Sequence, residues 1–213
     1  MSEDMCMELT VAQVARQHAR SDRFVQQALR LGALSGHRVL GRVTSVDDVA
    51  VQVWSRALGR GRRWTDQVRE AALDLLSTGH TDRLSASERS RLRSRLRRMS
   101  ATDMAHAAGG LGSSWARYRG KARTGLVRIG PSAAGRGELG IVPGEGWLTF
   151  VQTDDLDRFE IDEDVILDAD GNVGVIERAT VDDRIARILL DTFLLGDARQ
   201  SAAAAAELER RAS

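Results

Sequence analysis

Apolar residues recur every three or four positions through the first half of the chain, which is the spacing of amphipathic helices. Three helix starts are predicted within residues 9–54, because each offers side chains that accept hydrogen bonds from the free N–H groups of a first helical turn. They are a capping box of Thr10 with Gln13, then Ser21 followed by Asp22, then Ser45 with Asp47 and Asp48. Gly32 predicts the end of the second helix, and residues 39–43 predict a small β-wing before the third.

The helical pattern continues to about residue 110. Thr65 predicts a helix start and Gly79 its end, Ser85 forms a capping box with Glu88, and Ser100 caps a short helix that stops at Gly109. In the helix after Ser85, one narrow apolar stripe is surrounded by arginines at 89, 91, 93, 95, 97 and 98. The stripe consists of Leu92, Leu96 and Met99.

Strand-like segments follow a glycine-bearing stretch. Residues 111–134 are predicted to be a linker, and strands are predicted at 126–129, 139–142 and 147–151. Residues 165–167 and 173–176 flank Asp170-Gly171, which predicts a hairpin. Helices are expected after Thr180, ending at Gly196, and again over 198–211. The predicted core behind the linker contains Trp147, Leu148, Phe150, Val165, Leu167, Val173, Ile176, Ile185, Leu189 and Phe193.

These elements predict an α+β protein with a helix-turn-helix and wing at its N-terminus, an Arg-rich helical middle, and a small C-terminal β-sheet with two helices. The predicted domain boundaries are 1–60 for the first part, 61–110 for the Arg-rich helical segment, 111–134 for the linker and 135–213 for an acidic α+β domain.

Charge is divided along the chain, although the formal net charge is only +1. Residues 1–50 are balanced, residues 51–129 hold 17 basic against 6 acidic side chains, and residues 130–213 hold 8 against 18. Arginine outnumbers lysine 30 to 1, as a GC-rich coding bias would produce, but such a bias does not explain where the charge is placed. This division favours two partners, or two parts of one assembly.

The first quarter of the chain resembles the winged helix-turn-helix of excisionase and MerR-like DNA-binding domains. The resemblance rests on the threonine-capped first helix, the second helix started by Ser21, the Gly32-Ala-Leu34 exit, the basic wing and the third helix ending near Trp54. It departs at His18-Ala19-Arg20, where the family usually carries a glycine. Because an alanine with positive φ costs about 1 kcal/mol, we expect this turn to be built differently.

The second helix has one apolar and one polar face. Val25, Ala28 and Leu29 are expected to pack on the first helix, whereas Arg23, Gln26, Gln27 and Arg30 face outward. Arg and Gln match the edges of guanine and adenine in the major groove, so these four are candidate base contacts; the alternative is an ordinary solvated face. Arg38 and Arg42 are candidate phosphate contacts, and the full candidate DNA-binding set adds Arg20, Ser21 and His37.

Two further basic segments each have more than one possible role. Arg89, Arg93, Arg97 and Arg98 are candidate phosphate contacts, but the same helix could instead lie against the acidic C-terminal half or present a solvated face. The mixed aromatic and basic residues at 115–121 could stack on single-stranded nucleic acid, although such a cluster more often docks on its own domain.

No catalytic or cofactor pattern is present, and we expect no enzymatic activity, no metal and no cofactor. One cysteine and scattered histidines have no zinc-ligand spacing. Asp168, Asp170 and Asn172 resemble the start of a calcium loop, but Val173 and Ala179 occupy its sixth and twelfth positions. With no apolar run of membrane-spanning length and no signal-peptide pattern, the expected location is cytoplasmic, away from membranes.

The basic front and acidic rear together resemble the DNA-binding antitoxins of bacterial toxin–antitoxin operons. The resemblance beyond the first quarter is carried by RLSASERSRLRSRLRRMS, LDRFE, VILDADGNVGVIE and LLGDAR. It implies a regulator that binds double-stranded DNA, represses its own operon and neutralises a toxin protein through the acidic half. The alternatives are a stand-alone transcriptional regulator or excisionase-like accessory factor whose rear half forms a homodimer, and a structural adaptor without nucleic acid.

Overall fold

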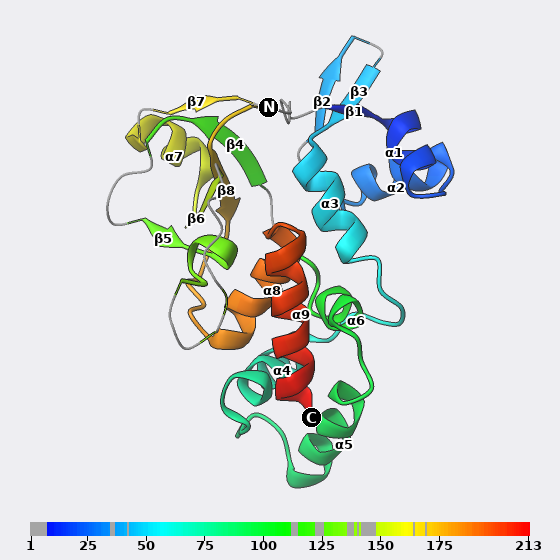
Figure 1. Cartoon of the computed structure of the whole chain (residues 1–213), viewed down its shortest axis with the longest axis vertical. Helices are drawn as coiled ribbons and strands as arrows, with labels where there is room; N and C mark the ends of the chain where they lie inside the picture. Colours follow the sequence, from blue (N-terminus) through cyan, green and yellow to red (C-terminus); the bar gives the residue numbers. More distant parts are fainter. Residues whose placement is uncertain are drawn as a thin grey trace. The chain divides into compact units, whose positions relative to one another are not determined.

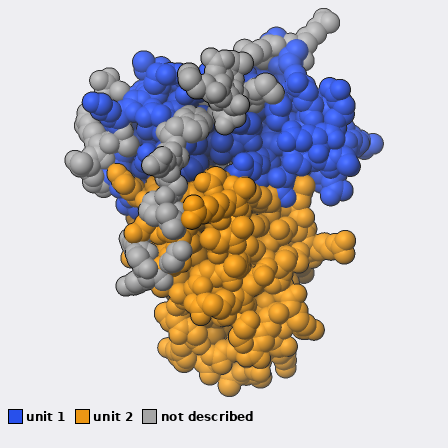
Figure 2. All heavy atoms as spheres, viewed as in Figure 1, with its two compact units in different colours: residues 1–55, 112–127, 147–180 blue, residues 56–111, 128–146, 181–213 orange. Residues whose placement is uncertain are grey.

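The computed structural model describes residues 8–34, 37–41, 43–111, 115–121, 126–135, 139, 141, 148–163, 165–168 and 170–213, with the backbone alone at 37, 38, 40 and 161–163. The chain forms two compact units, each assembled from three segments (Figure 2). Unit 1 comprises residues 1–55, 112–127 and 147–180; unit 2 comprises residues 56–111, 128–146 and 181–213. The α+β class is confirmed. The predicted boundary at 110 lies one residue from a boundary between the units, whereas those at 60 and 134 fall inside segments of unit 2.

Unit 1 begins with a helix pair and a small antiparallel sheet of strand order β1-β3-β2 (Figure 1). The elements are β1 (Leu9–Thr10), α1 (Val11–Gln17), α2 (Asp22–Arg30), β2 (His37–Leu40), β3 (Val43–Val46) and α3 (Asp48–Arg56). The caps predicted at Thr10 and Ser21 are confirmed: Thr10 and Gln13 form a capping box, and the Ser21 hydroxyl accepts a hydrogen bond from the Phe24 N–H.

The third helix is capped by Asp47. One carboxylate oxygen of Asp47 accepts hydrogen bonds from the N–H groups of Val49 at 2.8 Å and Ala50 at 3.2 Å. Ser45, which was predicted to share this role, is instead a buried residue of β3 opposite Thr10 and Arg38. The predicted helix start is therefore correct to within two residues. Asp47 caps the helix, whereas Ser45 is paired in β3 and lies outside the cap.

The turn between α1 and α2 contains an alanine with a positive φ, the conformation that we expected the turn to avoid because of its energetic cost. Ala19 has a φ of 50°, and it is the one non-glycine residue with a positive φ in the described part of the chain. The turn is closed by the Arg20 N–H, which donates to the Ala15 carbonyl at 2.9 Å. The expectation of a differently built turn was wrong: the packing of the two helices imposes the left-handed conformation on an alanine.

The second sheet of unit 1 has five strands in the order β5-β6-β8-β4-β7. Its elements are β4 (Trp115–Arg119), β5 (Val127–Arg128), β6 (Thr149–Thr153), α7 (Leu156–Glu163), β7 (Ile166–Leu167) and β8 (Val173–Glu177). Strand β4 runs antiparallel to both β8 and β7, and β6 runs parallel to β8. The strand predicted at 139–142 falls mostly outside the described residues.

The hairpin predicted at Asp170-Gly171 was wrong, because β4 lies between the two strands that the turn was expected to pair. Between β7 and β8 the chain passes over β4: the Asp168 N–H donates to the Arg117 carbonyl at 2.9 Å. A side-chain carbon on Gly171 would lie 2.3 Å from the Tyr118 carbonyl. The glycine is thus required for a close backbone crossing rather than for a two-residue turn.

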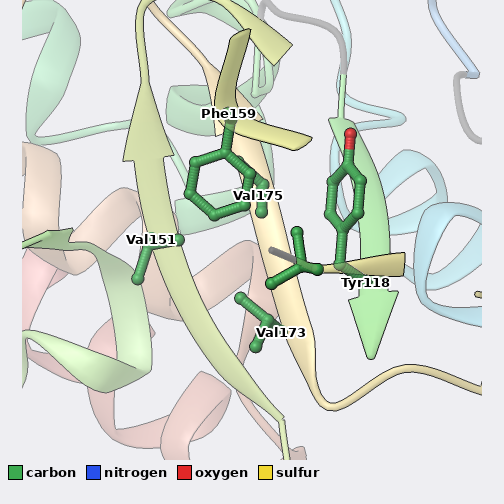
Figure 3. Close-up of a cluster of buried hydrophobic side chains, with 6 residues drawn as sticks. Tyr118, Val151, Phe159, Val173 and Val175 are labelled. Carbon is green, nitrogen blue, oxygen red and sulfur yellow. The ribbon is translucent and has the colours of Figure 1, made fainter. Parts of the chain in front are cut away.

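Residues predicted to be a linker form part of this sheet. Trp115, Arg117 and Tyr118 of β4 are buried, and the strand lies between β8 and β7 in the sheet. Tyr118 packs with Phe159 of α7 at 5.5 Å between ring centroids, and the cluster around them is shown in Figure 3. Its buried members are Tyr118, Val151, Phe159, Val165, Val173 and Val175. The aromatic residues 115 and 118 therefore pack inside their own unit.

The predicted C-terminal core divides between the units. Phe150, Val165, Val173 and Ile176 are buried in unit 1, whereas Leu189 and Phe193 are buried in unit 2. Leu167 was predicted to be buried but is 48% exposed, because β7 is the last strand of its sheet. Trp147 lies outside the described residues.

Unit 2 is helical around a central buried helix, α8. Its elements are α4 (Asp66–Thr78), α5 (Ala86–Leu96), α6 (Ala101–Ala107), the 3-10 turn η1 (Gly130–Ser132), α8 (Ile185–Leu195) and α9 (Ala198–Ala212). Residues 186–195 are all buried, and α8 contacts α4, α6, α9 and η1. The caps predicted for α4, α5 and α6 are confirmed at Thr65, Ser85 and Ser100.

Arg184 begins α8 in place of the predicted Thr180–Asp183 cap. Its guanidinium donates to three carboxylates, those of Asp182 at 2.6 Å, Glu70 at 2.8 Å and Asp74 at 2.9 Å. Burial opposes ionisation of Asp74 and Asp182, but it is outweighed at Asp182 by Arg184 and at Asp74 by Arg184 together with hydrogen bonds from Arg83 and Thr81, so that the pKa of both carboxyls is lowered. This network attaches the start of α8 to α4.

Among the residues with described structure, no helix has both the length and the apolar character needed to cross a membrane.

We predict that Ala19→Gly stabilises unit 1. Glycine has no steric cost in the left-handed conformation, which for alanine is about 1–2 kcal/mol. Its greater conformational entropy in the unfolded chain destabilises the fold by about 0.4–1 kcal/mol, so the free energy of unfolding should rise by about 0.5–1 kcal/mol. Urea unfolding followed by tryptophan fluorescence measures the change. As a control, Ala12→Gly on the exposed side of α1 should destabilise, because Ala12 is helical. Destabilisation by Ala19→Gly would contradict the strain assigned to this turn.

We also predict that the Arg184 network makes unit 2 sensitive to acid. Arg184→Gln should lower the free energy of unfolding by about 1.5–3 kcal/mol at neutral pH, because it removes charged hydrogen bonds. The lowered pKa values mean that this stabilisation is present above the ordinary value of 3.8 and is lost as the pH falls through the lower values of the folded state.

The difference in the free energy of unfolding between Arg184→Gln and the unmodified chain should therefore become smaller below about pH 3.8. Urea unfolding followed by far-UV circular dichroism at several pH values measures it. Arg199→Gln, which changes an exposed arginine of α9, is the control and should change stability by less than about 0.5 kcal/mol. A deficit that is independent of pH would contradict the role of the carboxylates.

Candidate nucleic-acid interface

The helix pair α1–α2 forms the base of the candidate interface. Val14 and Ala15 of α1 and Val25 and Ala28 of α2 are buried, as the apolar face of the second helix predicted. Leu29 is half-buried. This packing fixes which face of α2 remains outside, because the buried residues occupy the side of the helix toward α1.

The outer face of α2 carries the four predicted base-reading residues. Arg23, Gln26, Gln27 and Arg30 are all exposed, and the spacing of three, four and seven residues places them in one stripe. None of the four side chains hydrogen-bonds or ion-pairs with another residue of the described structure. A ligand therefore meets donors and acceptors with no internal bond to give up.

An aromatic group supports the N-terminal end of this stripe. Trp54 of α3 is buried and contacts the His18 ring edge-on at 5.8 Å and the Phe24 ring at 5.9 Å between centroids. The Arg20 guanidinium lies 5.4 Å from the centre of the Phe24 ring. Burial, with a smaller effect of the nearby Arg20 charge, lowers the pKa of His18. The lowered pKa favours the neutral imidazole, and through its ring contact with Trp54 His18 belongs to the support of α2.

Two further predicted contacts have local roles at this end. The Ser21 oxygen accepts the Phe24 N–H at 3.3 Å, so the hydroxyl retains its O–H for a second partner. Arg20 is exposed at the same end of α2, where a helix N-terminus also favours anions. Both residues are thus at the position where a phosphate would meet the helix.

Strands β2 and β3 form a hairpin beside the helix pair. Leu40 lies opposite Val43, which leaves a two-residue loop, and Gly41 adopts the positive φ of 64° that short hairpin loops need. Val39 and Val43 are 66% and 50% exposed. Of the predicted contacts, the side chains of His37 and Arg38 and the whole of Arg42 lie outside the described residues.

Arg117 attaches this region to the five-stranded sheet of unit 1, a role that the sequence did not indicate. Its guanidinium lies 3.0 Å from the second carboxylate oxygen of Asp47, and it also donates to the Gly171 carbonyl at 3.2 and 3.3 Å. Burial raises the pKa of Asp47, whereas Arg117 and the helix amides act in the opposite direction. The one sequence signal was a basic residue alternating with aromatic ones at 115–118.

The arginines predicted as phosphate contacts on α5 are mostly engaged within unit 2. Arg89 donates to the Thr81 carbonyl at 2.9 Å, Arg93 to the Gly79 carbonyl, and Arg97 to the Ser213 carbonyl at 2.9 Å. Arg98 donates to the Ser94 carbonyl of its own helix at 3.0 Å. The structure therefore does not bring these residues together as a free anion-binding set.

Within the described ranges, no group of three or more His, Cys, Asp or Glu residues is arranged to hold a metal ion. The site consists of hydrogen-bonding side chains on a helix, beside a β-hairpin.

The chain matches no protein-family model, no curated protein and no solved structure.

Proposed function

We propose that this protein is a sequence-specific DNA-binding regulator and that residues 8–56 act as a winged helix-turn-helix. The supporting observation is the exposed stripe of Arg23, Gln26, Gln27 and Arg30 on α2, next to the β2–β3 hairpin. In this proposal α2 enters the major groove and the hairpin is the wing.

The chemistry of the stripe favours base reading over simple attraction to phosphate. Arginine donates two hydrogen bonds to guanine, and the glutamine amide both donates to and accepts from adenine. A face used only for phosphate would need donors alone, whereas Gln26 and Gln27 also offer acceptors. The alternation of Arg and Gln along one helix face is therefore suited to distinguishing base pairs.

The residues that pack against α2 are suited to fixing the orientation of its exposed stripe. Ser21 fixes the start of α2, and Trp54 holds the turn through His18 and Phe24. Recognition of base edges requires a helix whose orientation is set by packing, because errors of about 0.5 Å weaken directional hydrogen bonds. The buried side of the helix pair supplies this rigidity.

We predict that Gln26→Ala and Gln27→Ala each weaken binding to a selected operator by about 1–3 kcal/mol and relax the choice of base at one position. The operator is selected from random duplexes with the full chain, and affinities are measured by fluorescence anisotropy. Gln17→Ala, on the exposed side of α1, is the matched control and should leave base preference unchanged. Unchanged preference in both α2 variants would exclude α2 as the reading helix.

A second candidate function, binding of a basic partner protein, is favoured by the acidic edge of unit 1. Here the acidic edge means α7 with strand β7 and their flanks. Its exposed carboxylates are Asp154, Asp155, Asp157, Glu160 and Asp170. Burial, together with the negative charges of Glu160, Asp157 and Glu177, raises the pKa of Tyr118. Opposite potential would speed encounter with a cationic protein.

The acidic edge also offers apolar contact area. Ile166 is 71% and Leu167 48% exposed on β7, the terminal strand of its sheet. A terminal strand has unpaired backbone groups to which a partner strand can add. This combination supports the antitoxin form of the proposal, in which one protein binds operator DNA and a basic toxin.

We predict that Ile166→Ser with Leu167→Ser reduces the affinity for the protein encoded beside this gene by at least about tenfold, because apolar contacts are lost. Co-purification and calorimetry with that protein measure the effect. Val181→Ser is the control, since Val181 is 59% exposed outside the edge. An unaffected complex, or an equal loss in the control, would leave the stand-alone regulator as the better account.

A further inference from the structure

Helix α5 presents two rows of arginine with different chemical surroundings. Leu92 and Leu96 are buried, and α5 contacts α4. Around this apolar stripe, arginines 89, 93 and 97 form one row with a four-residue spacing, and arginines 91 and 95 form another. In Figure 1, α5 is the helix in unit 2 that follows the turn after α4.

The first row has a structural role. Arg89 and Arg93 donate to the carbonyls of Thr81 and Gly79, in the turn that ends α4, and Arg97 donates to the carbonyl of Ser213. Carbonyls at the end of a helix lack intrahelical partners, and arginine satisfies them while complementing the negative end of the helix dipole. This row therefore needs no external ligand.

The second row has no such partner. Arg91 and Arg95 are exposed, and within the described structure neither side chain makes a hydrogen bond or ion pair. Ser90 and Ser94, also exposed, lie beside them on the helix. The result is a surface of N–H and O–H donors. The nearby carboxylate of Glu88 caps the helix start: hydrogen bonds from Ser85, with a smaller effect of the Arg91 charge, lower the pKa of Glu88.

This arrangement costs stability when no anion is present. Like charges four residues apart on a helix repel each other by about 0.2–0.5 kcal/mol per pair. Several other helix arginines of unit 2 have carboxylate partners: Arg69 pairs with Asp66, and Arg210 and Arg211 pair with Glu207. Arg199 of α9 is exposed and, like Arg91 and Arg95, has no carboxylate partner among the described residues. What sets Arg91 and Arg95 apart is that two such arginines lie one helical turn apart beside two serine hydroxyls, with their donors available to an anion outside the chain.

We propose that Arg91 and Arg95, with the hydroxyls of Ser90 and Ser94, bind the phosphate backbone of duplex DNA without reading its sequence. Arginine and serine are common phosphate donors, and one helical turn separates the two guanidiniums by about 6 Å, so that both can contact one polyanion. The inference deepens the proposed function and rests on it for the choice of DNA. In this proposal the phosphate contacts are made by Arg91 and Arg95, and not by Arg89, Arg93 and Arg97.

The test compares two variants of the full chain that lose the same charge from the same helix. Binding of a random-sequence duplex is measured by fluorescence anisotropy over a range of salt concentrations. Each lost phosphate contact reduces the slope of log K against log salt by about 0.9, so Arg91→Gln with Arg95→Gln should reduce it by about 1.8. Arg89→Gln with Arg93→Gln should change it by less than half as much.

If Arg89→Gln with Arg93→Gln unfolds α5, a lysine variant of the second row provides the comparison instead. Arg91→Lys with Arg95→Lys retains two positive charges that can contact phosphate, and it should restore most of the slope. Equal slopes in the two glutamine variants, or an unchanged slope in Arg91→Gln with Arg95→Gln, would overturn the proposal. Binding to vesicles of anionic lipid without binding to the duplex would overturn it as well.

The α2 variants separate this inference from the proposed function. If Gln26→Ala and Gln27→Ala alter base preference while the α5 variants leave the salt slope unchanged, only the phosphate contact by α5 fails. If the α5 variants change the slope while the α2 variants leave base preference unchanged, only the base-reading function fails. A chain that binds no duplex at low salt would overturn both.

Discussion

The buried pair of Arg117 and Asp47 is the interaction on which the arrangement of unit 1 depends. The Arg117 side chain is 2% exposed and that of Asp47 is 11% exposed, at 3.0 Å. One oxygen of Asp47 caps α3, while the other receives Arg117, whose remaining donors reach the Gly171 carbonyl. Asp48 also lies 3.6 Å from Arg117, so it is removal of Arg117 that leaves a buried carboxylate, that of Asp47, without its cation; such a loss costs about 3–5 kcal/mol. The pair therefore couples the start of α3 to the sheet strand β4 and to the crossing that follows β7.

This coupling explains why unit 1 is discontinuous in sequence. Strand β4 pairs with β8 on one side and β7 on the other, and both of these strands come after α7 in the chain. The crossing at Gly171 brings a third segment against the Tyr118 backbone, where only glycine fits. Residues on both sides of the predicted linker consequently belong to one compact unit, and the acidic edge is in the same unit as α2.

The arginines of this protein fall into groups distinguished by how their charge is compensated. Arg117 and Arg184 are bound by carboxylates and join distant segments. Arg89, Arg93 and Arg97 bind backbone carbonyls. Among the residues with described positions, the exposed arginines of α2 and the second row of α5 have neither kind of partner, and these two surfaces carry the proposed contacts with nucleic acid. Abundance of arginine alone does not separate these groups, since each contains the same side chain.

The sequence by itself determined five of the helix starts, because a cap and an amphipathic face depend on residues within one or two turns. Thr10 with Gln13, Ser21, Thr65, Ser85 with Glu88, and Ser100 each start a helix as predicted, and the polar stripe of α2 follows from the same spacing. The tertiary structure decided the order of the strands, the partners of the arginines and the division into units. Asp170-Gly171 favours a hairpin locally, yet β4 occupies the position between the strands, and a glycine-like turn was imposed on Ala19. Arg117 and Asp47 are 70 residues apart, and no local pattern encodes a contact whose energy arises only when both are removed from water together.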